Sequence, residues 1–268
     1  MFGFRRRRRQ RLMSRPFPPE WTSILERNVP LYRRLSPADQ QELRGRILVF
    51  LDEKRFEGCG GLTMSDDIRV TIAAHACVLL LHREETGYYP LLKSIVVYPS
   101  HFVVQQTRPG PGGLALEGWE ARAGESWRHG AVVLAWDHVQ RQAADLHDGH
   151  NVVLHEFAHQ LDQEDGRADG VPLLPRRTMY TAWARILGQD YRELVSAAEG
   201  NGSALLDTYG ATNPAEFFAV ATEFFFEAPR QLQARHPKLY EELQLYYRQD
   251  PAALPPEPRG SAGGPTAF

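Results

Sequence analysis

Histidine and glutamate residues at helical spacing are the clearest chemical signal in this chain. His155 and His159 are four positions apart and Glu156 follows the first histidine, which makes the pattern H-E-x-x-H. Residues four apart lie on one face of a helix, so both imidazoles can bind one metal ion from the same side. Glu156 is then placed to accept a proton from a water molecule at that metal. The pattern therefore predicts two metal ligands and a general base, as a zinc peptidase requires.

The residues around this motif predict a helix of about three turns. Apolar residues recur at helical spacing through 151–162, and Asp148 fits a helix start. The stretch 165–170 is rich in Asp and Gly and predicts a loop that ends the helix. The alternative is a buried helix with two ordinary core histidines, but it leaves Glu156 without a reason to lie between them.

A catalytic zinc site needs a third protein ligand. The metzincin extension requires Gly and His at the positions of Asp162 and Asp165, so that subclass is excluded. A carboxylate from a later helix is the remaining option. The downstream candidates are Asp190, Glu193, Glu199, Asp207, Glu216, Glu223 and Glu227.

A second helix, predicted to begin near Pro214, carries two of these candidates. Thr212 or Asn213 can cap it. The helix is apolar nearly all round and is therefore expected to be buried, with Glu216 and Glu223 two turns apart on one face. A buried carboxylate needs a cation or strong hydrogen bonds to stay charged, and a metal provides this for one of the two. The alternative for Glu216 is a solvated first-turn carboxylate near the positive end of the helix dipole.

Two blocks of sequence resemble the Mlc titration factor A family of zinc-dependent peptidases, which is of the gluzincin type. They are HEFAHQLD at 155–162 and YGATNPAEFFA at 209–219. The second block also resembles the catalytic domain of anthrax lethal factor. The resemblance includes 97–104, 130–136 and 167–172, and it spans most of residues 17–250.

The resemblance implies a complete set of site residues. By position, His155, His159 and Glu216 become the ligands of one Zn²⁺ ion per chain. Glu156 becomes the general base, and Tyr209 becomes an auxiliary group able to donate a hydrogen bond to an oxyanion. The alternative for Tyr209 is a core tyrosine at a turn.

The groups around the ligands are predicted less completely. Glu223 and Asp162 are candidate acceptors for the second ring nitrogens of the ligand histidines, although Glu223 also fits a surface position. Some family members carry an upstream histidine that caps the zinc ion. The corresponding stretch here, 113–120, contains no histidine, so a resting state capped in that way is not expected.

The order of helical and strand patterns predicts an α+β fold. Helices are expected over 20–57, with a helix start at Ser36, over 66–81 and in further segments ending near Tyr247. Strands are expected at 95–98 and 101–104, with a pair of strands across 114–123. The resemblance implies a zincin-like metallopeptidase core with a small mixed sheet and flanking N- and C-terminal helices. The run 130–136 fits either a substrate-binding sheet edge or a buried central strand.

Composition divides the chain into three expected parts. Residues 1–16 are predicted to be a basic disordered arm, 17–250 a single zincin-like peptidase domain and 251–268 a disordered Pro/Gly-rich tail. The arginine run Arg5–Arg9 either binds an anionic lipid, nucleic acid or protein, or is simply solvated. A net charge of −2 gives no other reason to expect nucleic-acid binding.

The cytoplasm is the expected location. Two cysteines are too few for a disulfide framework. No stretch approaches the roughly 18 consecutive apolar residues of a membrane span. The first residues run directly into arginines without the apolar core of a secretory signal.

The expected function is that of a zinc metallopeptidase with aminopeptidase-like or oligopeptidase activity on peptide substrates. A rival is a non-catalytic regulatory protein that sequesters a transcription repressor and so regulates sugar uptake; the family resemblance allows it, because the family is named for titrating the repressor Mlc. The two functions are not exclusive, and an intact Glu156 favours catalysis. A purely structural zinc domain is the weakest alternative, because structural sites usually use four ligands including cysteines.

Overall fold

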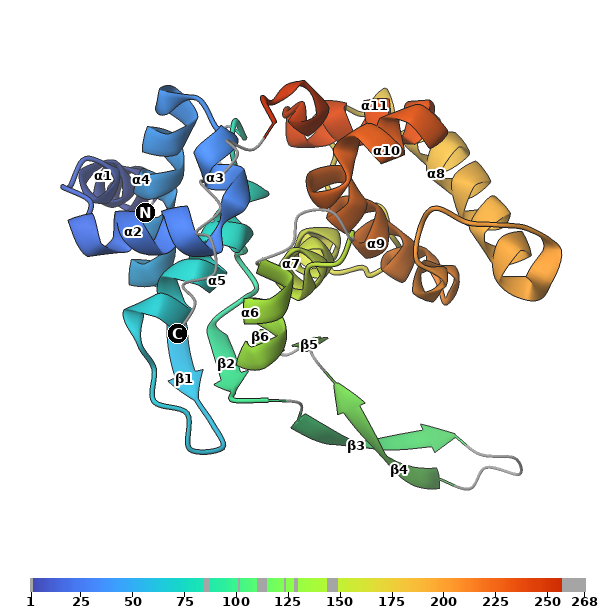
Figure 1. The fold of residues 1–268 in the computed structure, drawn as a ribbon, viewed down its shortest axis with the longest axis horizontal. Coiled ribbons are helices and arrows are strands. Elements are labelled where there is room, and N and C mark those ends of the chain that lie inside the picture. The colour runs from blue at the N-terminus through green and yellow to red at the C-terminus, as the bar shows by residue number, and fades with distance from the viewer. Residues whose placement is uncertain are drawn as a thin grey trace, which may run out of the picture.

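The fold is α+β, as predicted, and mostly helical, with one small sheet and a separate two-stranded hairpin (Figure 1). Of residues 102–127 only the backbone of the strands is described. The residues that the computed structural model describes are 2–83, 87–100, 102–109, 115–122, 124–127, 130–143 and 149–256.

The N-terminal part of the chain forms a group of packed helices. Ser36 and Ser65 cap two of them by accepting hydrogen bonds from the backbone N–H groups of Asp39 and Ile68. The segment predicted to be helical over 20–57 contains three helices, each of which begins at a proline, and its last residues form a strand. The helices are α1 (Phe2–Met13), α2 (Pro19–Asn28), α3 (Pro30–Arg34), α4 (Pro37–Glu53) and α5 (Asp66–Val78).

Helix α1 lies within residues 1–16, the segment for which a basic disordered arm is predicted. Arg8 and Arg9 pair with Asp52 and Glu53 of α4 at 2.6 and 2.7 Å, and Leu12 is buried. Acidic residues at the end of α4 therefore provide ion-pair partners within the chain for two arginines of α1.

A small mixed sheet lies beside these helices, in the strand order β1-β2-β6-β5. Strands β1, β2 and β6 are parallel, and β5 pairs with β6 in the antiparallel direction. Of the two interpretations of residues 130–136, the central strand is therefore the one observed, and β5 lies at the edge. The strands are β1 (Arg55–Gly58), β2 (Ser94–Tyr98), β5 (Gly124–Trp127) and β6 (Ala131–Ala135).

A hairpin formed by β3 (Phe102–Pro109) and β4 (Ala115–Arg122) extends away from the body of the molecule (Figure 1). The sequence predicted a pair of strands within 114–123. The structure has a single strand there, and its antiparallel partner is the strand predicted near residue 102.

Helix α7, which carries the H-E-x-x-H motif, lies between the N-terminal helices and the C-terminal helices (Figure 1). Its Phe157 ring lies 5.7 Å from the ring of Phe50 and 4.8 Å from that of Tyr89. One continuous hydrophobic core thus holds α7 in place. The remaining elements are α6 (Trp136–Ala143), α7 (Val152–Asp162), η2 (Gln163–Asp165), α8 (Met179–Ser196), the π-helical turn η3 (Ala197–Asn201), η4 (Thr208–Ala211), α9 (Pro214–Glu227), α10 (Pro229–Arg235), α11 (Pro237–Tyr247) and η5 (Pro251–Ala253).

In the described part of the chain, no helix combines the length and the apolar character needed to cross a membrane. The division into one domain over 17–250 and a disordered tail over 251–268 stays a prediction. Residues 257–268 of that tail lie outside the described residues.

Candidate functional site

Asn151 fixes the start of α7. Its Oδ1 accepts a hydrogen bond from the Leu154 N–H at 3.1 Å, which caps the helix. Its own backbone N–H donates to Glu223 Oε2 at 2.6 Å, and its Nδ2 donates to Glu227 Oε1 at 2.8 Å. Asn151 therefore ties the start of the motif helix to α9. This role is not among the predictions from the sequence, although an asparagine just before an apolar helix is a recognised cap signal. Asp148, the predicted helix start, lies outside the described residues.

Helix α9 begins as predicted, with Pro214 in its first turn and Asn213 as its cap. Asn213 Oδ1 accepts a hydrogen bond from the Glu216 N–H at 3.0 Å. This cap sets where the first turn begins and hence where the Glu216 side chain projects. Helices α7 and α9 pack against each other, so Glu216 faces the histidines of the motif.

A loop after α7 supports the start of α9. Gly170 has φ +77°, and a Cβ atom placed on it would lie 2.3 Å from the carbonyl oxygen of Pro214. The Gly170 N–H donates to Asp162 Oδ2 at 3.0 Å, and the Gly170 carbonyl accepts from Trp183 Nε1 at 3.1 Å. Only glycine permits this close approach. Asp162 therefore positions the loop, and the structure does not give it the predicted hydrogen bond to a ligand histidine.

The structure brings together the three predicted ligands, His155, His159 and Glu216. The Nε2 atoms of the two imidazoles lie 3.0 and 3.2 Å from Glu216 Oε2 and 3.2 Å from each other. Their side chains are between 11 and 18% exposed. Three potential ligand atoms converge on one point close to the protein surface.

Glu223 orients one of these histidines. Its Oε1 lies 2.7 Å from His155 Nδ1, while its Oε2 accepts the hydrogen bond from the Asn151 N–H. With Nδ1 bound to a carboxylate, His155 presents Nε2 to the cluster. Glu223 is buried, so the surface position considered for it is wrong and the predicted acceptor role agrees with the geometry.

The pKa values of the cluster residues result from burial, which disfavours their charged forms, and from close partners of opposite charge, which favour them. Burial disfavours a charged Glu216, but hydrogen bonds from His155 and His159 hold its pKa well below the usual range. Burial also disfavours a charged His155, and Glu223 and Glu216 outweigh it, so the pKa of His155 lies well above its ordinary value. The cluster therefore has the electrostatic character of a site for a cation.

Glu156 lies next to the cluster and has a different environment. Its side chain is buried, and its Oε2 atom has no hydrogen-bond partner among the described residues. Burial raises the pKa of Glu156 to about 7, although both histidines of the motif oppose this shift. A buried carboxylate oxygen without a partner is costly and calls for an explanation in terms of function.

Tyr209 lies at the open side of the cluster. Its ring centroid is 5.9 Å from that of His155, and the residue is 54% exposed, which excludes the core alternative. Asp207 Oδ1 accepts a hydrogen bond from the Tyr209 N–H at 2.8 Å and so fixes the turn η4. The side chains of 113–120, where an upstream histidine was considered, lie outside the described residues.

The donor set fits a divalent metal. Two imidazole nitrogens and one carboxylate oxygen lie within 4.8 Å of one another, which matches the three-ligand pattern of catalytic zinc sites. The unpaired Glu156 oxygen beside them fits a group that acts on a ligand of the metal. Two other groups of this kind occur among the described residues, Asp39–Glu42–His82 and Asp190–Glu193–His236, and each has a single histidine.

Comparisons with known proteins agree with this arrangement. The family description "Glucose-regulated metallo-peptidase M90" matches residues 4–248. The chain is 45% identical over 245 residues to the uncharacterized protein slr2042 of Synechocystis, covering 91% of this chain and 89% of that protein. It is 35% identical to the Mlc titration factor A of Pectobacterium atrosepticum, covering 84% and 85% of the two chains. It is 36% identical to that of Serratia proteamaculans, covering 87% and 88%. Because the match extends over most of its length and includes both helices of the cluster, this chain belongs to the glucose-regulated metallo-peptidase M90 family.

Proposed function

We propose that the protein is a zinc-dependent metallopeptidase that hydrolyses peptide bonds, with His155, His159 and Glu216 as metal ligands. The observation that carries the proposal is the convergence of these three side chains on one point, with Nε2 to Oε2 distances of 3.0 and 3.2 Å. A zincin-like arrangement of α7 and α9 is part of this proposal. Membership of a metallopeptidase family supports a divalent metal, and the two-nitrogen, one-oxygen donor set favours zinc.

The ligands are held ready for the metal by the chain itself. A bound zinc ion supplies Lewis acidity, which polarises the scissile carbonyl and makes water a stronger acid. Glu223 holds the His155 ring by its Nδ1 atom, so that Nε2 keeps its direction. The asparagine caps of α7 and α9 set the helix starts, and with them the positions of the three ligands along the two helices.

Glu156 is the proposed general base. Its Oε2 atom, which has no hydrogen-bond partner among the described residues, can accept a proton from the attacking water and pass it to the leaving amine. A raised pKa suits both steps, because a group that titrates near neutral pH can take up and release the proton.

Tyr209 is the proposed auxiliary residue. It is exposed beside His155, where its hydroxyl can donate a hydrogen bond to the oxyanion that forms from the substrate carbonyl. This contact becomes stronger as negative charge develops, so Tyr209 is expected to act on turnover more than on substrate binding.

The test is hydrolysis of chromogenic aminoacyl and peptide substrates by the purified protein and by its Glu156→Gln form, with zinc content measured in both. Loss of the base lowers kcat by about 10²–10⁴-fold. Zinc content is expected to stay the same, because Glu156 is not a ligand in the proposal. If both forms hold zinc and neither cleaves any substrate, the peptidase proposal is wrong. The same substrates distinguish aminopeptidase-like from oligopeptidase activity.

A second candidate function is regulatory. The Pectobacterium and Serratia relatives are named Mlc titration factor A, and this suggests that the chain sequesters a transcription repressor of the Mlc type and thereby acts on sugar uptake. The two functions separate in one measurement. If repressor binding is the whole function, the Glu156→Gln form releases the repressor from its operator as well as the unchanged protein does. If cleavage is required, that form loses the release.

The cytoplasm stays the proposed location. Cys59 and Cys77 are both free thiols, as a reducing compartment favours. Measured distribution of the tagged protein between cell fractions tests this proposal directly.

A further inference from the structure

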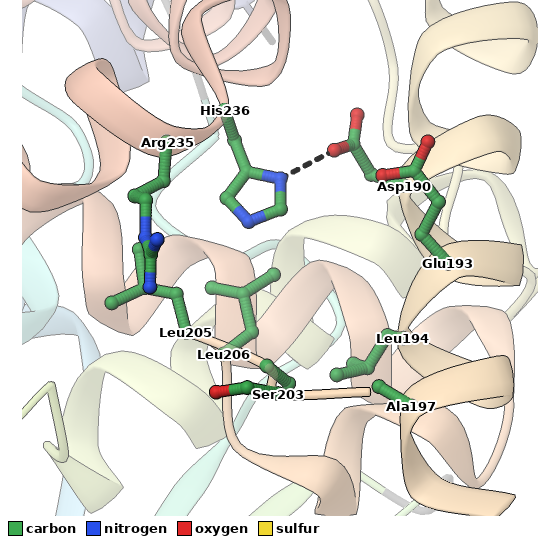
Figure 2. Close-up of a pocket in the computed structure, with 10 residues that line it drawn as sticks. Asp190, Glu193, Leu194, Ala197, Ser203, Leu205, Leu206, Arg235 and His236 are labelled. Atoms are coloured by element: carbon green, nitrogen blue, oxygen red, sulfur yellow. Dashed lines mark hydrogen bonds and ion pairs between the residues drawn. The ribbon is translucent and has the colours of Figure 1, made fainter. Parts of the chain in front are cut away.

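A small cavity lies in the C-terminal part of the molecule, between α8, the turn η3, the segment 203–206 and the junction of α10 with α11 (Figure 2). Its volume is about 210 Å³, and none of the proposed zinc-site residues lines it. Part of its wall is the π-helical turn at the end of α8, where Gly200 has φ +89°.

One side of the cavity carries negative charge. Asp190 and Glu193 lie one turn apart on α8, and both side chains border the cavity (Figure 2). His236 Nδ1 donates a hydrogen bond to Asp190 Oδ1 at 2.5 Å, and these two side chains are only 19 and 12% exposed. Glu193 is exposed and accepts a hydrogen bond from Gln189 Nε2 at 3.0 Å. The carboxylate of Glu193 therefore has no cationic partner among the described residues.

A positive group lies on the other side. Arg235 lines the cavity across from the two carboxylates, with the His236 ring between them in the view of Figure 2. Its guanidinium forms no ion pair or hydrogen bond with the described residues. A cation and an anion that face the same small cavity without pairing with each other fit a ligand that carries both charges.

The floor of the cavity is apolar. It is made by Leu194, Leu205 and Leu206, of which Leu194 and Leu206 are buried. The volume is below the 300–1,000 Å³ of sites for drug-sized molecules, so the occupant is small. A metal ion fits less well, because it leaves the leucines without a role and lies near an arginine.

We propose that this cavity binds a free amino acid with an apolar side chain. Its ammonium group contacts Glu193 and Asp190, its carboxylate binds Arg235, and its side chain packs on the leucine floor. The proposal is independent of peptidase activity, because it concerns binding alone and is tested by binding alone.

The test is calorimetric titration of the zinc-loaded protein with L-leucine, leucinamide, N-acetyl-leucine and glycine. Leucine is expected to bind. Each of the other three compounds lacks the free carboxylate, the free ammonium group or the apolar side chain of leucine. Leucinamide cannot use Arg235, N-acetyl-leucine cannot use the carboxylates, and glycine cannot use the floor. Each is expected to bind at least about tenfold more weakly than leucine.

Two variants test whether leucine binds in this cavity. Arg235→Gln and Glu193→Gln each remove one exposed charge and are expected to weaken leucine binding by about tenfold or more. The matched controls are Arg55→Gln and Glu57→Gln, which make the same changes at exposed positions on β1 and leave binding unchanged. Thermal unfolding of all four shows whether they fold.

Several results would overturn the proposal. One is the absence of saturable leucine binding up to about 10 mM. Equal binding of the blocked analogues is another. Leucine binding that persists in both cavity variants would place the amino acid elsewhere, for example at the His155 cluster. Binding of a second Zn²⁺ that is lost in Glu193→Gln would make the cavity a cation site instead.

Discussion

Two clusters in the molecule place a histidine at hydrogen-bonding distance from a carboxylate, yet they are built differently. They are the His155 cluster (His155, His159 and Glu216) and the His236 cluster (Asp190, Glu193 and His236). In the His155 cluster a second histidine lies one turn away on the same helix, and Glu216 comes from a neighbouring helix that packs on it. In the His236 cluster the single histidine lies where α10 ends and α11 begins, and Glu193 is exposed. The first presents several ligand atoms to one point, whereas the second pairs its histidine with one carboxylate.

The larger difference lies behind the ligands. His155 Nδ1 is held by Glu223, which also holds the start of α7, and Asn151 connects that start to Glu227. The described residues include no such second set of contacts around the His236 pair. A metal site needs ligands whose directions are fixed in advance. Matching residue types in proximity are therefore not sufficient for a metal site, and we expect the supporting contacts to distinguish the proposed zinc site from the His236–Asp190 pair.

The largest expected effect is a loss of zinc affinity when the His155 cluster, and not the His236 cluster, loses a carboxylate. Glu216→Gln removes a negatively charged ligand and is expected to weaken zinc binding by more than the roughly 10–100-fold seen for supporting residues. Glu193→Gln is the control and should leave zinc content unchanged. Metal analysis after dialysis against a zinc buffer measures both. Zinc retained in the first variant and lost in the second would reverse the comparison.

A smaller effect is expected when the support is altered and the ligands are kept. Glu223→Gln keeps a hydrogen-bond acceptor for His155 but loses the charge that is shared with the Asn151 N–H, so zinc affinity should fall by about 10–100-fold. Competition with a chelator of known affinity measures the change. If zinc is lost in Glu223→Gln but kept in Glu216→Gln, the assignment of ligand and support is wrong.

The loop at Gly170 supports the His155 cluster and not the His236 cluster. Alanine substitutions at Gly166 and Gly170 together test this support. Gly166→Ala adds a side chain at φ +88° in open space and should destabilise the protein by about 1–2 kcal/mol through backbone strain. Gly170→Ala adds similar strain and also a collision with the Pro214 carbonyl, so its loss should be larger. Urea unfolding measures both. Because Pro214 begins the helix of Glu216, only Gly170→Ala is expected to weaken zinc binding.

The smallest expected effect is a pH dependence at Asp162, which holds that loop. Burial raises the pKa of Asp162 to about 6, above its ordinary value of 3.8. The folded protein therefore binds more protons than the unfolded chain between these values, and the stabilising contribution of Asp162 falls as the pH rises through 6. Asp162→Asn removes this titration. The stability of the wild type relative to this variant should be higher near pH 4.5 than near pH 7.5, as measured by urea unfolding. An equal difference at both pH values would contradict the prediction.

Local patterns predicted several features correctly for identifiable reasons. The apolar periodicity of 151–162 and the Asn-Pro start of α9 were sufficient to place two helices, because caps and periodicity act within a few residues. Sequence patterns predicted the local structure incorrectly where it depends on contacts with distant segments. The stretch predicted to be helical continues to residue 57, but pairing with β2 makes 55–58 a strand. The arginine run lies in α1, where Arg8 and Arg9 pair with Asp52 and Glu53 of α4.

The amino-acid sequence alone specifies the chemical types at the candidate site and their order along the chain. The motif placed two imidazoles on one helix face, and the resemblance named Glu216 and Tyr209. Tertiary structure decided which carboxylate faces both imidazoles and which supports one of them. Glu216 and Glu223 lie on the same helix and have the same side chain, and only the packing of α9 on α7 gives them different neighbours. The reason is physical: spacing along one helix fixes directions within that helix, whereas distances between helices depend on the core that holds them together.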